Sequence, residues 1–112
     1  MLPKINRLRK KKDLGRVFKK GKNVRSPVLY FKVLKTKEPS SRIGFIVSKK
    51  ISLKAVERNK IRRRLRESVR AALSTLKESW DIVIIASPRI KKSSFEEIRK
   101  ETEETFKNIN NV

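Results

Sequence analysis

Hydrophobic and polar residues follow strand-like patterns in three short segments of the chain. Residues 27–35 alternate between the two classes, with apolar side chains on one face and Tyr30 and Lys32 on the other. Residues 42–48 form a second alternating segment, and the short, turn-like connection predicts that these two strands form an antiparallel hairpin. Residues 80–86 are an almost unbroken apolar run, which predicts a central strand buried on both faces.

Helical spacing dominates two other segments. Apolar positions predict a short helix over about residues 12–20, which Asp13 can start and Gly21 can end. A long helix is expected over about residues 57–77, where apolar residues recur at helical intervals. The predicted core stripe of this long helix consists of Ile61, Leu65, Val69, Ala72, Leu73 and Leu76.

The last part of the chain predicts one more helix, which Ser93 or Ser94 can cap. Residues 95–112 hold more acids than bases, so this helix is expected to face away from any polyanion. The resulting order, α-β-β-α-β-α, predicts an α+β fold with two layers. Residues 1–112 suffice for one core, so we expect a single domain in which residues 1–10 form a flexible basic arm.

The charge balance points to a polyanionic partner. The chain carries 32 Lys and Arg residues against 11 Asp and Glu, for a net charge of +21 and an isoelectric point near 11.1. Nucleic acid is the commonest polyanion that meets such a charge. Cysteine and histidine are absent, which excludes thiolate or imidazole zinc sites and a histidine base. No apolar run approaches the roughly 20 residues of a membrane span, and a cytoplasmic protein is expected.

The densest basic feature begins at Ser48, followed by two lysines, and continues through residues 58–66. On a helix with about 100° per residue, the arginines form a wide face beside the core stripe. Glu57 and Glu67 are too few to neutralise this face, which argues against an ordinary solvated helix. Guanidinium groups bind phosphate in bidentate fashion, which favours a structured RNA backbone as the ligand. The candidate RNA-binding residues are Lys49, Lys50, Arg58, Asn59, Lys60, Arg62, Arg63 and Arg66.

Three residues offer chemistry beyond phosphate binding. The amide of Asn59 can read a sugar or base edge or hold a hydrated metal ion, or it can simply start the helix. Phe18 lies on a basic helix and Tyr30 on the less apolar face of a strand, so both can stack unpaired bases. Core packing is the alternative for both aromatic residues.

The run from Val47 to Glu67, with its Ser-Lys-Lys and Arg-Asn elements, resembles the signature of the bacterial ribonuclease P protein family. Residues 13–35, and the strand at 81–86 with the Glu-rich helix after it, also fit that family in order and spacing. The resemblance covers nearly the whole chain. It implies an α+β sandwich with a mixed sheet, a long central helix and a left-handed βαβ crossover, an exception to the usual handedness.

The resemblance also implies a function. The protein would be the small subunit of a ribonucleoprotein endonuclease, a hydrolase whose RNA subunit removes the 5′ leader of precursor tRNA with Mg²⁺. It would bind that catalytic RNA and grip the single-stranded leader in a cleft between the central helix and the sheet. No catalytic side chain is implied for the protein, and the ions would be bound mainly by the RNA subunit and substrate. One protein per RNA is expected, without a membrane partner.

Carried over by position, the resemblance assigns the leader cleft to Leu14, Phe18 and Tyr30 and the other RNA contacts to the basic residues named above. Two positions depart from the family pattern. Lys60 stands where arginine is frequent, so no bidentate contact is expected there. Leu14 stands where an aromatic residue is usual, so apolar contact is expected to replace stacking at that end of the cleft.

Two other classes compete with this interpretation. A ribosomal protein that binds structured rRNA fits the composition equally well, but it would not need Phe18 and Tyr30 to form a cleft beside the 58–66 helix. A nuclease that acts without RNA would need clustered carboxylates for metal ions. Its acids would have to come from residues that are scattered along the sequence, such as Asp13 and Asp81.

Overall fold

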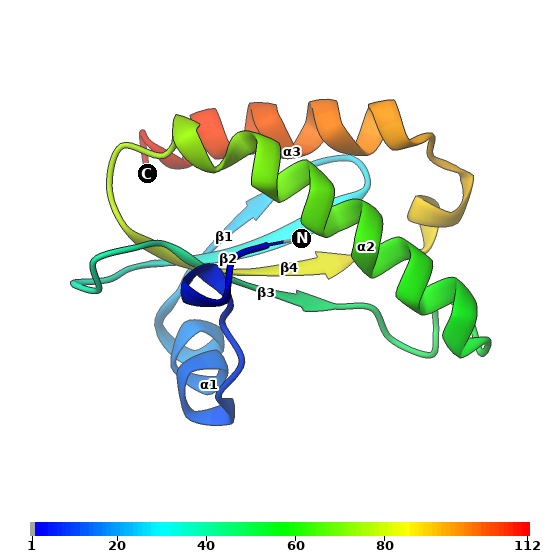
Figure 1. Ribbon diagram of the computed structural model, residues 1–112, viewed down its shortest axis with the longest axis horizontal. Helices are drawn as coiled ribbons and strands as arrows, with labels where there is room; N and C mark the ends of the chain where they lie inside the picture. Colours follow the sequence, from blue (N-terminus) through cyan, green and yellow to red (C-terminus); the bar gives the residue numbers. More distant parts are fainter. Residues whose placement is uncertain (1) are drawn as a thin grey trace.

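One mixed, four-stranded sheet carries helices on both of its faces in the computed structural model, which describes residues 2–112 (Figure 1). Strand β4 is the most apolar of the four and lies inside the sheet, in agreement with its expected central place. The elements in chain order are η1 (Lys4–Asn6), α1 (Lys11–Lys20), β1 (Lys22–Arg25), β2 (Leu29–Lys35), β3 (Arg42–Ile46), α2 (Ala55–Ala72), η2 (Leu73–Thr75), β4 (Trp80–Ala86), η3 (Pro88–Lys92) and α3 (Phe95–Ile109).

The strand order is β1-β2-β4-β3, which overturns the predicted hairpin. Strand β2 pairs antiparallel with β1 and β4, whereas β3 pairs parallel with β4. The segment between β2 and β3 therefore leads to the far edge of the sheet, because β4 is inserted between these two strands. The nearly complete burial of β4 explains why this strand lies between β2 and β3, since only a central position covers both faces of a strand. Helix α2 connects the parallel strands β3 and β4, and the left-handed sense of this crossover stays a prediction.

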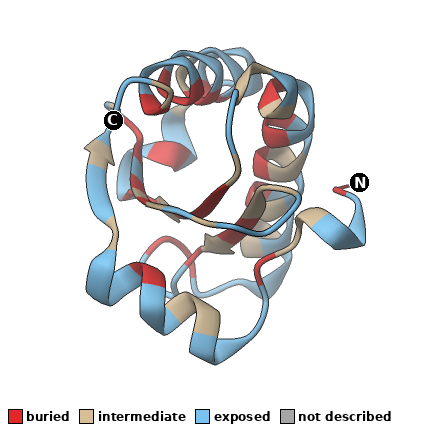
Figure 2. Ribbon diagram, turned by 90° about the vertical axis from the view of Figure 1, so that its left-hand side faces the viewer, coloured by how far each residue is buried: buried red, intermediate tan, exposed pale blue. Residues whose placement is uncertain are grey.

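The two faces of the sheet carry different helices (Figure 2). On one face, alternate residues of β2 and β4 pack with α2 and α3 into the main core. The rings of Phe31 and Phe106 meet edge-to-face there, with centroids 6.4 Å apart. On the other face, α1 packs through a much smaller cluster of buried residues, Leu8, Val17 and Val83.

The three predicted helices are confirmed, with small shifts at their ends. Helix α2 begins two residues before the expected position, and its buried residues include the first four of the predicted stripe, while Leu73 and Leu76 follow the regular helix and are partly buried. Ser94 caps α3, where its Oγ accepts a 3.1 Å hydrogen bond from the Glu97 backbone N–H. Gly21 follows the last residue of α1 as predicted, and glycine is needed there because a Cβ would collide with the carbonyl oxygen of Val17.

Residues 2–9 differ from the expected loose arm. Leu2 is buried in the main core and Leu8 in the cluster on the α1 face. The Leu8 backbone N–H donates a 3.0 Å hydrogen bond to the carbonyl oxygen of Ile43, next to a parallel bridge between Arg7 and Ile43. The two leucines explain the difference, since they provide apolar anchors within a segment that is otherwise basic. Met1 lies outside the described residues.

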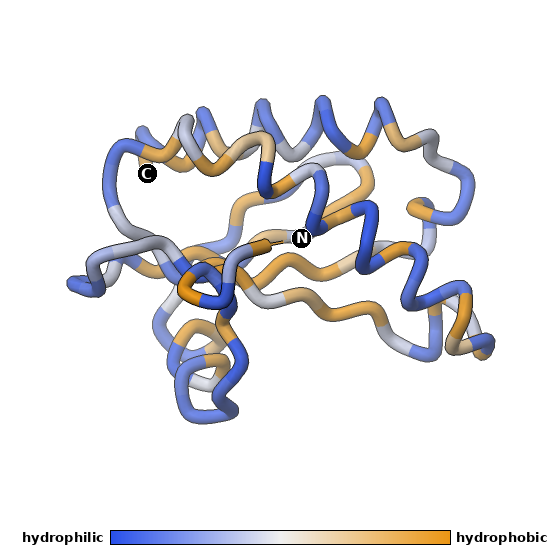
Figure 3. The backbone as a smooth tube through the Cα atoms, viewed as in Figure 1, coloured by the Kyte–Doolittle hydropathy of each residue, from blue (hydrophilic) through white to orange (hydrophobic). Residues whose placement is uncertain are grey.

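Hydrophobic positions gather along the strands and the inner sides of the helices, and hydrophilic positions follow the outer turns of α2 and α3 (Figure 3). None of the helices within residues 2–112 has the length and apolar character needed to cross a membrane.

Candidate nucleic-acid interface

Helix α2 presents a basic groove on its outer side. The core stripe, which includes Ile61 and Leu65, faces the sheet and leaves the arginine-rich side open. Four of the predicted RNA-binding residues share one groove, which therefore offers a single polyanion several cationic groups at once. The groove is lined by Val56, Asn59, Lys60, Arg63, Arg66 and Glu67.

Two of the predicted RNA-binding arginines hold the loop that leads into α2. The Arg58 guanidinium donates a 2.8 Å hydrogen bond to the carbonyl oxygen of Ser52. The Arg62 guanidinium donates a 3.4 Å hydrogen bond to the carbonyl oxygen of Val47. Lys49 and Lys50 lie between these two anchor points and are exposed. Arg58 and Arg62 thus fix the loop that presents the two lysines, in addition to the N–H groups they keep for a phosphate.

Asn59 is an exposed residue on the groove, and its amide oxygen already has a partner. The Arg62 guanidinium donates a 2.9 Å hydrogen bond to Asn59 Oδ1. The oxygen that a hydrated cation would use therefore already accepts a hydrogen bond from a guanidinium group, whose positive charge disfavours a cation beside it. Within residues 2–112, no three Asp, Glu, His or Cys side chains are grouped closely enough to hold a metal ion. The residues present do not fit a protein-held magnesium site.

A second groove joins α2 to the N-terminal segment across the edge strand β3. Arg62 and Arg66 line it from α2, while Arg7 and Arg9 line it from residues 2–9. Sequence reasoning missed these two arginines, because it treated the segment as a loose arm. The buried Leu8 between them is the signal that shows how they are held.

Phe18 of α1 and Tyr30 of β2 lie on the face of the sheet opposite to α2. They are 39% and 42% exposed, which is too open for core residues of this size and favours the stacking interpretation. Leu14 is partly buried and packs on the small cluster, so it contributes more to holding α1 than the two aromatic rings do. A cation accompanies each ring: Lys32 Nζ lies 6.0 Å from the centroid of Phe18, and the Arg25 guanidinium 5.4 Å from that of Tyr30.

The strand register extends the aromatic surface across the sheet. Tyr30 pairs with Ile85 of β4, which in turn pairs with Ile46 of β3. Both isoleucines are only partly buried, so an apolar strip continues from the tyrosine towards the β3 edge. At the other end of this strip, a groove contains Arg25, Tyr30 and Arg89. Arg25, Lys32 and Arg89 were missed because isolated cations carry no signal in so basic a chain.

The prediction that the leader-cleft residues lie between the central helix and the sheet is wrong. Side chains alternate along β2, so Leu29 and Phe31 face α2 and α3 while Tyr30 faces α1. The aromatic surface and the basic groove of α2 are therefore on opposite sides of the sheet. The groove that contains Arg66 also includes Gly44 and Phe45, so it reaches the β3 edge of the sheet.

An ionic network joins α1 to the sheet. Arg42 forms two hydrogen bonds to the fully buried carboxylate of Asp81, at 2.9 and 2.8 Å. The hydrogen bond to Asp81 is the main reason that the pKa of Arg42 is raised above its ordinary value. Arg16 and Asp13 of α1 complete the network. Two acids that are distant in the sequence thus meet here, but both are bound to arginines rather than directed at an open metal site.

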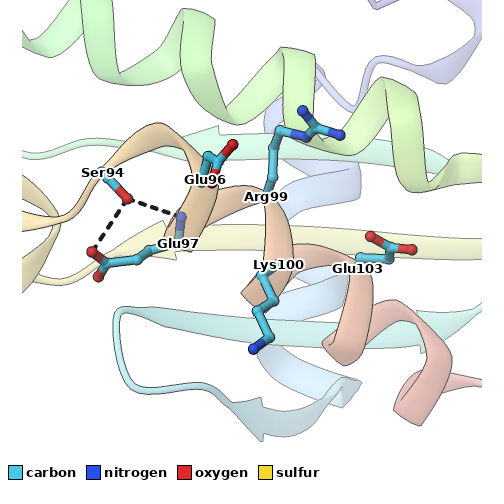
Figure 4. A pocket seen from close by; sticks show the side chains of 6 residues that line it. All are labelled: Ser94, Glu96, Glu97, Arg99, Lys100 and Glu103. Atoms are coloured by element: carbon cyan, nitrogen blue, oxygen red, sulfur yellow. Dashed lines mark hydrogen bonds between the residues drawn. The ribbon is translucent and has the colours of Figure 1, made fainter.

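Helix α3 carries another hollow with a different character (Figure 4). Glu96, Glu97 and Glu103 share it with Arg99 and Lys100, so the charges of both signs are interspersed. Such a surface repels a phosphate backbone more than the α2 groove does. That the last helix faces away from a polyanion stays a prediction.

The fold and these two surfaces define an α+β RNA-binding protein, with guanidinium groups for phosphates and exposed aromatic rings for bases. A family model described as Ribonuclease P matches residues 2–110. The chain belongs to the ribonuclease P protein family. It is therefore an RNA-binding protein of tRNA processing and a part of an endoribonuclease holoenzyme.

Individual relatives agree with this assignment. The chain is 39% identical over 99 residues to the ribonuclease P protein component of Pseudanabaena sp. (strain PCC 6903), with 88% of this chain and 85% of that protein covered. A Staphylococcus aureus RNase P protein mutant with defective mRNA degradation activity has a similar structure, with 33% identity, a TM-score of 0.85 and coverage of 95% and 89%. The RNase P protein from Thermotoga maritima gives 28% identity, a TM-score of 0.81 and coverage of 91% and 96%.

Proposed function

We propose that this chain binds the catalytic RNA subunit of ribonuclease P and the 5′ leader of precursor tRNA, and assists the Mg²⁺-dependent removal of that leader. The observation that carries the proposal is the pair of exposed aromatic rings, Phe18 and Tyr30, each with a cation beside it. Residues 1–112 act as one RNA-binding domain, with one protein for each RNA, in the cytoplasm. The RNA performs the hydrolysis, and the protein alone does not cleave.

The two surfaces divide the work between them. Leaders differ in sequence, so they are best bound by stacking and by phosphate contacts, which accept any base. The α1 face offers both, through Phe18, Tyr30, Arg25 and Lys32. The catalytic RNA is a folded molecule with a dense phosphate backbone, which suits the arginine groove around Arg63 on α2.

Magnesium ions belong to the RNA part of this complex. The carboxylates of Asp13 and Asp81 are bound to arginines, and the amide oxygen of Asn59 is bound to Arg62. The protein contributes cationic groups, which reduce repulsion between leader and catalytic RNA and hold the leader in place.

The alternatives lose support for specific reasons. Binding of structured rRNA would not require two exposed aromatic rings on the α1 face. Cleavage by the protein alone would require carboxylates free to bind metal ions, and the Asp13 and Asp81 carboxylates are committed to Arg16 and Arg42.

The proposal is tested by cleavage of precursor tRNA at low Mg²⁺ with the cognate RNA subunit, with and without the protein, and with the protein alone. Leader length is the main variable. We expect Phe18→Ala to weaken binding of long-leader substrates by about 5- to 150-fold, the value of one base–aromatic stack. Phe95→Ala is the matched control, because Phe95 is equally exposed, at 38%, but lies on α3.

Arg66→Ala tests the other surface in the same assay. We expect it to weaken binding of the RNA subunit and to lower the salt dependence of that binding, whereas Arg99→Ala on α3 leaves both unchanged. Cleavage by the protein without RNA would refute the proposal and support a metal-dependent nuclease. An absence of any rescue, together with tight binding to rRNA, would support the ribosomal alternative.

A further inference from the structure

Helix α1 is attached to the sheet by few apolar contacts. Only Val17 of this helix is buried, and it packs with Leu8 and Val83. The same helix carries Phe18, which is exposed and does not belong to this cluster. A helix with so small an apolar anchor needs another contact that fixes its position, and the ionic network provides it.

Asp81 is the centre of that network. Its side chain has no solvent exposure and comes from the second residue of the inner strand β4, on the face that α1 covers. Arg42 of β3 binds both carboxylate oxygens, at 2.9 and 2.8 Å, and Arg16 of α1 reaches Oδ2 at 3.3 Å. Asp13 of α1 lies 3.4 Å from Arg42 and 3.5 Å from Arg16. Two carboxylates and two guanidinium groups thus alternate across the junction between helix and sheet.

The network depends on the charge of Asp81. A buried carboxylate is tolerated where cationic partners and hydrogen bonds replace water, as Arg42 and Arg16 do here. Without that charge, the two arginines would be held beside each other with only Asp13 between them. Like charges at this distance repel, and Arg16 can move away because its side chain is 43% exposed.

The position of Phe18 follows from this contact. Once the contact between Arg16 and Asp81 is lost, α1 is free to shift on the sheet, and Phe18 shifts with it because it lies on the same rigid helix. Tyr30 does not move with it, because β2 is hydrogen-bonded on both sides. The distance between the two rings, which sets whether one RNA strand can contact both, therefore depends on the network.

We propose that Asp81 is a positioning residue for the RNA leader: through Arg42 and Arg16 it fixes α1 on the sheet so that Phe18 and Tyr30 contact the same strand. The inference rests on the proposed function, since it concerns the surface that binds the leader. Asp81 touches no RNA itself, because its side chain is inaccessible.

The test compares Asp81→Asn with the unmodified chain, each assembled with the cognate RNA subunit. The measured quantity is the leader preference, defined as the affinity for a precursor with a long leader divided by that for a precursor with a single leader nucleotide. Asparagine keeps the shape but removes the charge. We expect the leader preference to fall at least fivefold, while the affinity for the RNA subunit stays within twofold.

Two more variants separate positioning from a general loss of stability. Ile98→Ala removes a buried side chain of α3 and destabilises the protein from the opposite face of the sheet. We expect it to leave the leader preference unchanged. Arg42→Lys keeps the charge but loses the two-pronged contact, so a lowered leader preference is expected there too. Arg42→Lys carries the test if Asp81→Asn does not fold.

The outcomes are distinct. An unmodified chain without any leader preference refutes the proposed leader binding itself. A normal preference in that chain, retained in Asp81→Asn or in a folded Arg42→Lys variant, overturns only the positioning role. An equal loss in Ile98→Ala also overturns it, because the effect would then follow stability rather than the position of α1.

Discussion

The two faces of the sheet are built on different principles. The α2/α3 face carries one continuous apolar core, in which residues such as Phe31, Leu65 and Phe106 are fully buried. The α1 face has three buried apolar residues, an ionic network and a strip of partly exposed aromatic and aliphatic side chains. Complete apolar coverage stabilises the fold but leaves nothing for a ligand. The α1 face shows the converse, since incomplete coverage leaves rings that RNA bases can contact.

The largest expected effect comes from the well-covered face. Phe106→Ala removes a fully buried ring that meets Phe31 edge-to-face, and we expect a loss of about 3–5 kcal/mol in the free energy of unfolding. Urea denaturation followed by circular dichroism measures this loss. Leader preference, measured on the folded protein, is expected to stay unchanged.

Phe95→Ala is the control for that loss. It removes the same side chain from an exposed position on α3, and we expect less than about 0.5 kcal/mol. If Phe106→Ala abolished leader preference while the protein remained folded, the two faces would not be separable as described here.

A smaller effect is expected from Gly44→Ala on the opposite face. A Cβ at this position would lie 2.9 Å from the carbonyl oxygen of Leu8 and 3.0 Å from Cδ2 of Leu14. The added methyl therefore pushes the N-terminal segment and α1 away from β3. We expect a loss of about 1–3 kcal/mol, typical of overpacking, together with a lower leader preference. Thermal unfolding and the leader assay measure the two quantities.

Gly15→Ala offers the matched control within α1. A Cβ at Gly15 meets no atom within 4 Å, so the substitution adds no collision. Alanine in place of glycine within a helix stabilises it by roughly 0.5–1 kcal/mol. A destabilised Gly15→Ala variant, or a neutral Gly44→Ala variant, would contradict the described packing of α1.

The same contrast explains what the sequence could predict. The main core was predictable, because β4 is almost wholly apolar and the stripe from Ile61 to Ala72 has helical spacing. Strand β1 was not, because Lys22–Arg25 is short, polar and mostly exposed, so it lacks the alternation that identifies a strand. The hairpin was wrong for a related reason: a short connection does not reveal that a later strand is inserted between two earlier ones.

The site was predictable in its chemistry but less so in its geometry. Arg63, Arg66 and Asn59 were identified from their density along one helix, and the structure brings them to one groove. The placement of the aromatic pair on the face away from α2 required the strand register, which sequence alone does not supply. The partnership of Asp81 with Arg42 joins residues of different strands, and no local pattern indicates it.

The smallest expected effect concerns an ion pair on the α2 side that, unlike the Asp81 network, is open to water. Glu57 lies 3.7 Å from Lys91, and both side chains are exposed. The Ser52 hydroxyl, and to a lesser degree Lys91 and Lys54, hold the pKa of Glu57 below its ordinary value of 4.5. Because the pKa of Glu57 is lower in the folded than in the unfolded protein, its carboxylate stabilises the fold at pH values above 4.5. This stabilisation is lost as the pH falls through the lowered pKa of the folded protein.

Glu57→Gln removes the ionisable group, and we expect its unfolding midpoint at pH 7 to lie only slightly below that of the unmodified chain, because exposed ion pairs are screened. The midpoints of both proteins, followed from pH 7 down to pH 3, are expected to converge as Glu57 is protonated. A large loss at pH 7 would contradict the contrast between the two faces, since an exposed ion pair would then stabilise the fold as strongly as buried charges do. A small loss would show that this exposed ion pair adds little to stability, in contrast to the role inferred for the buried charges that hold α1 on the sheet.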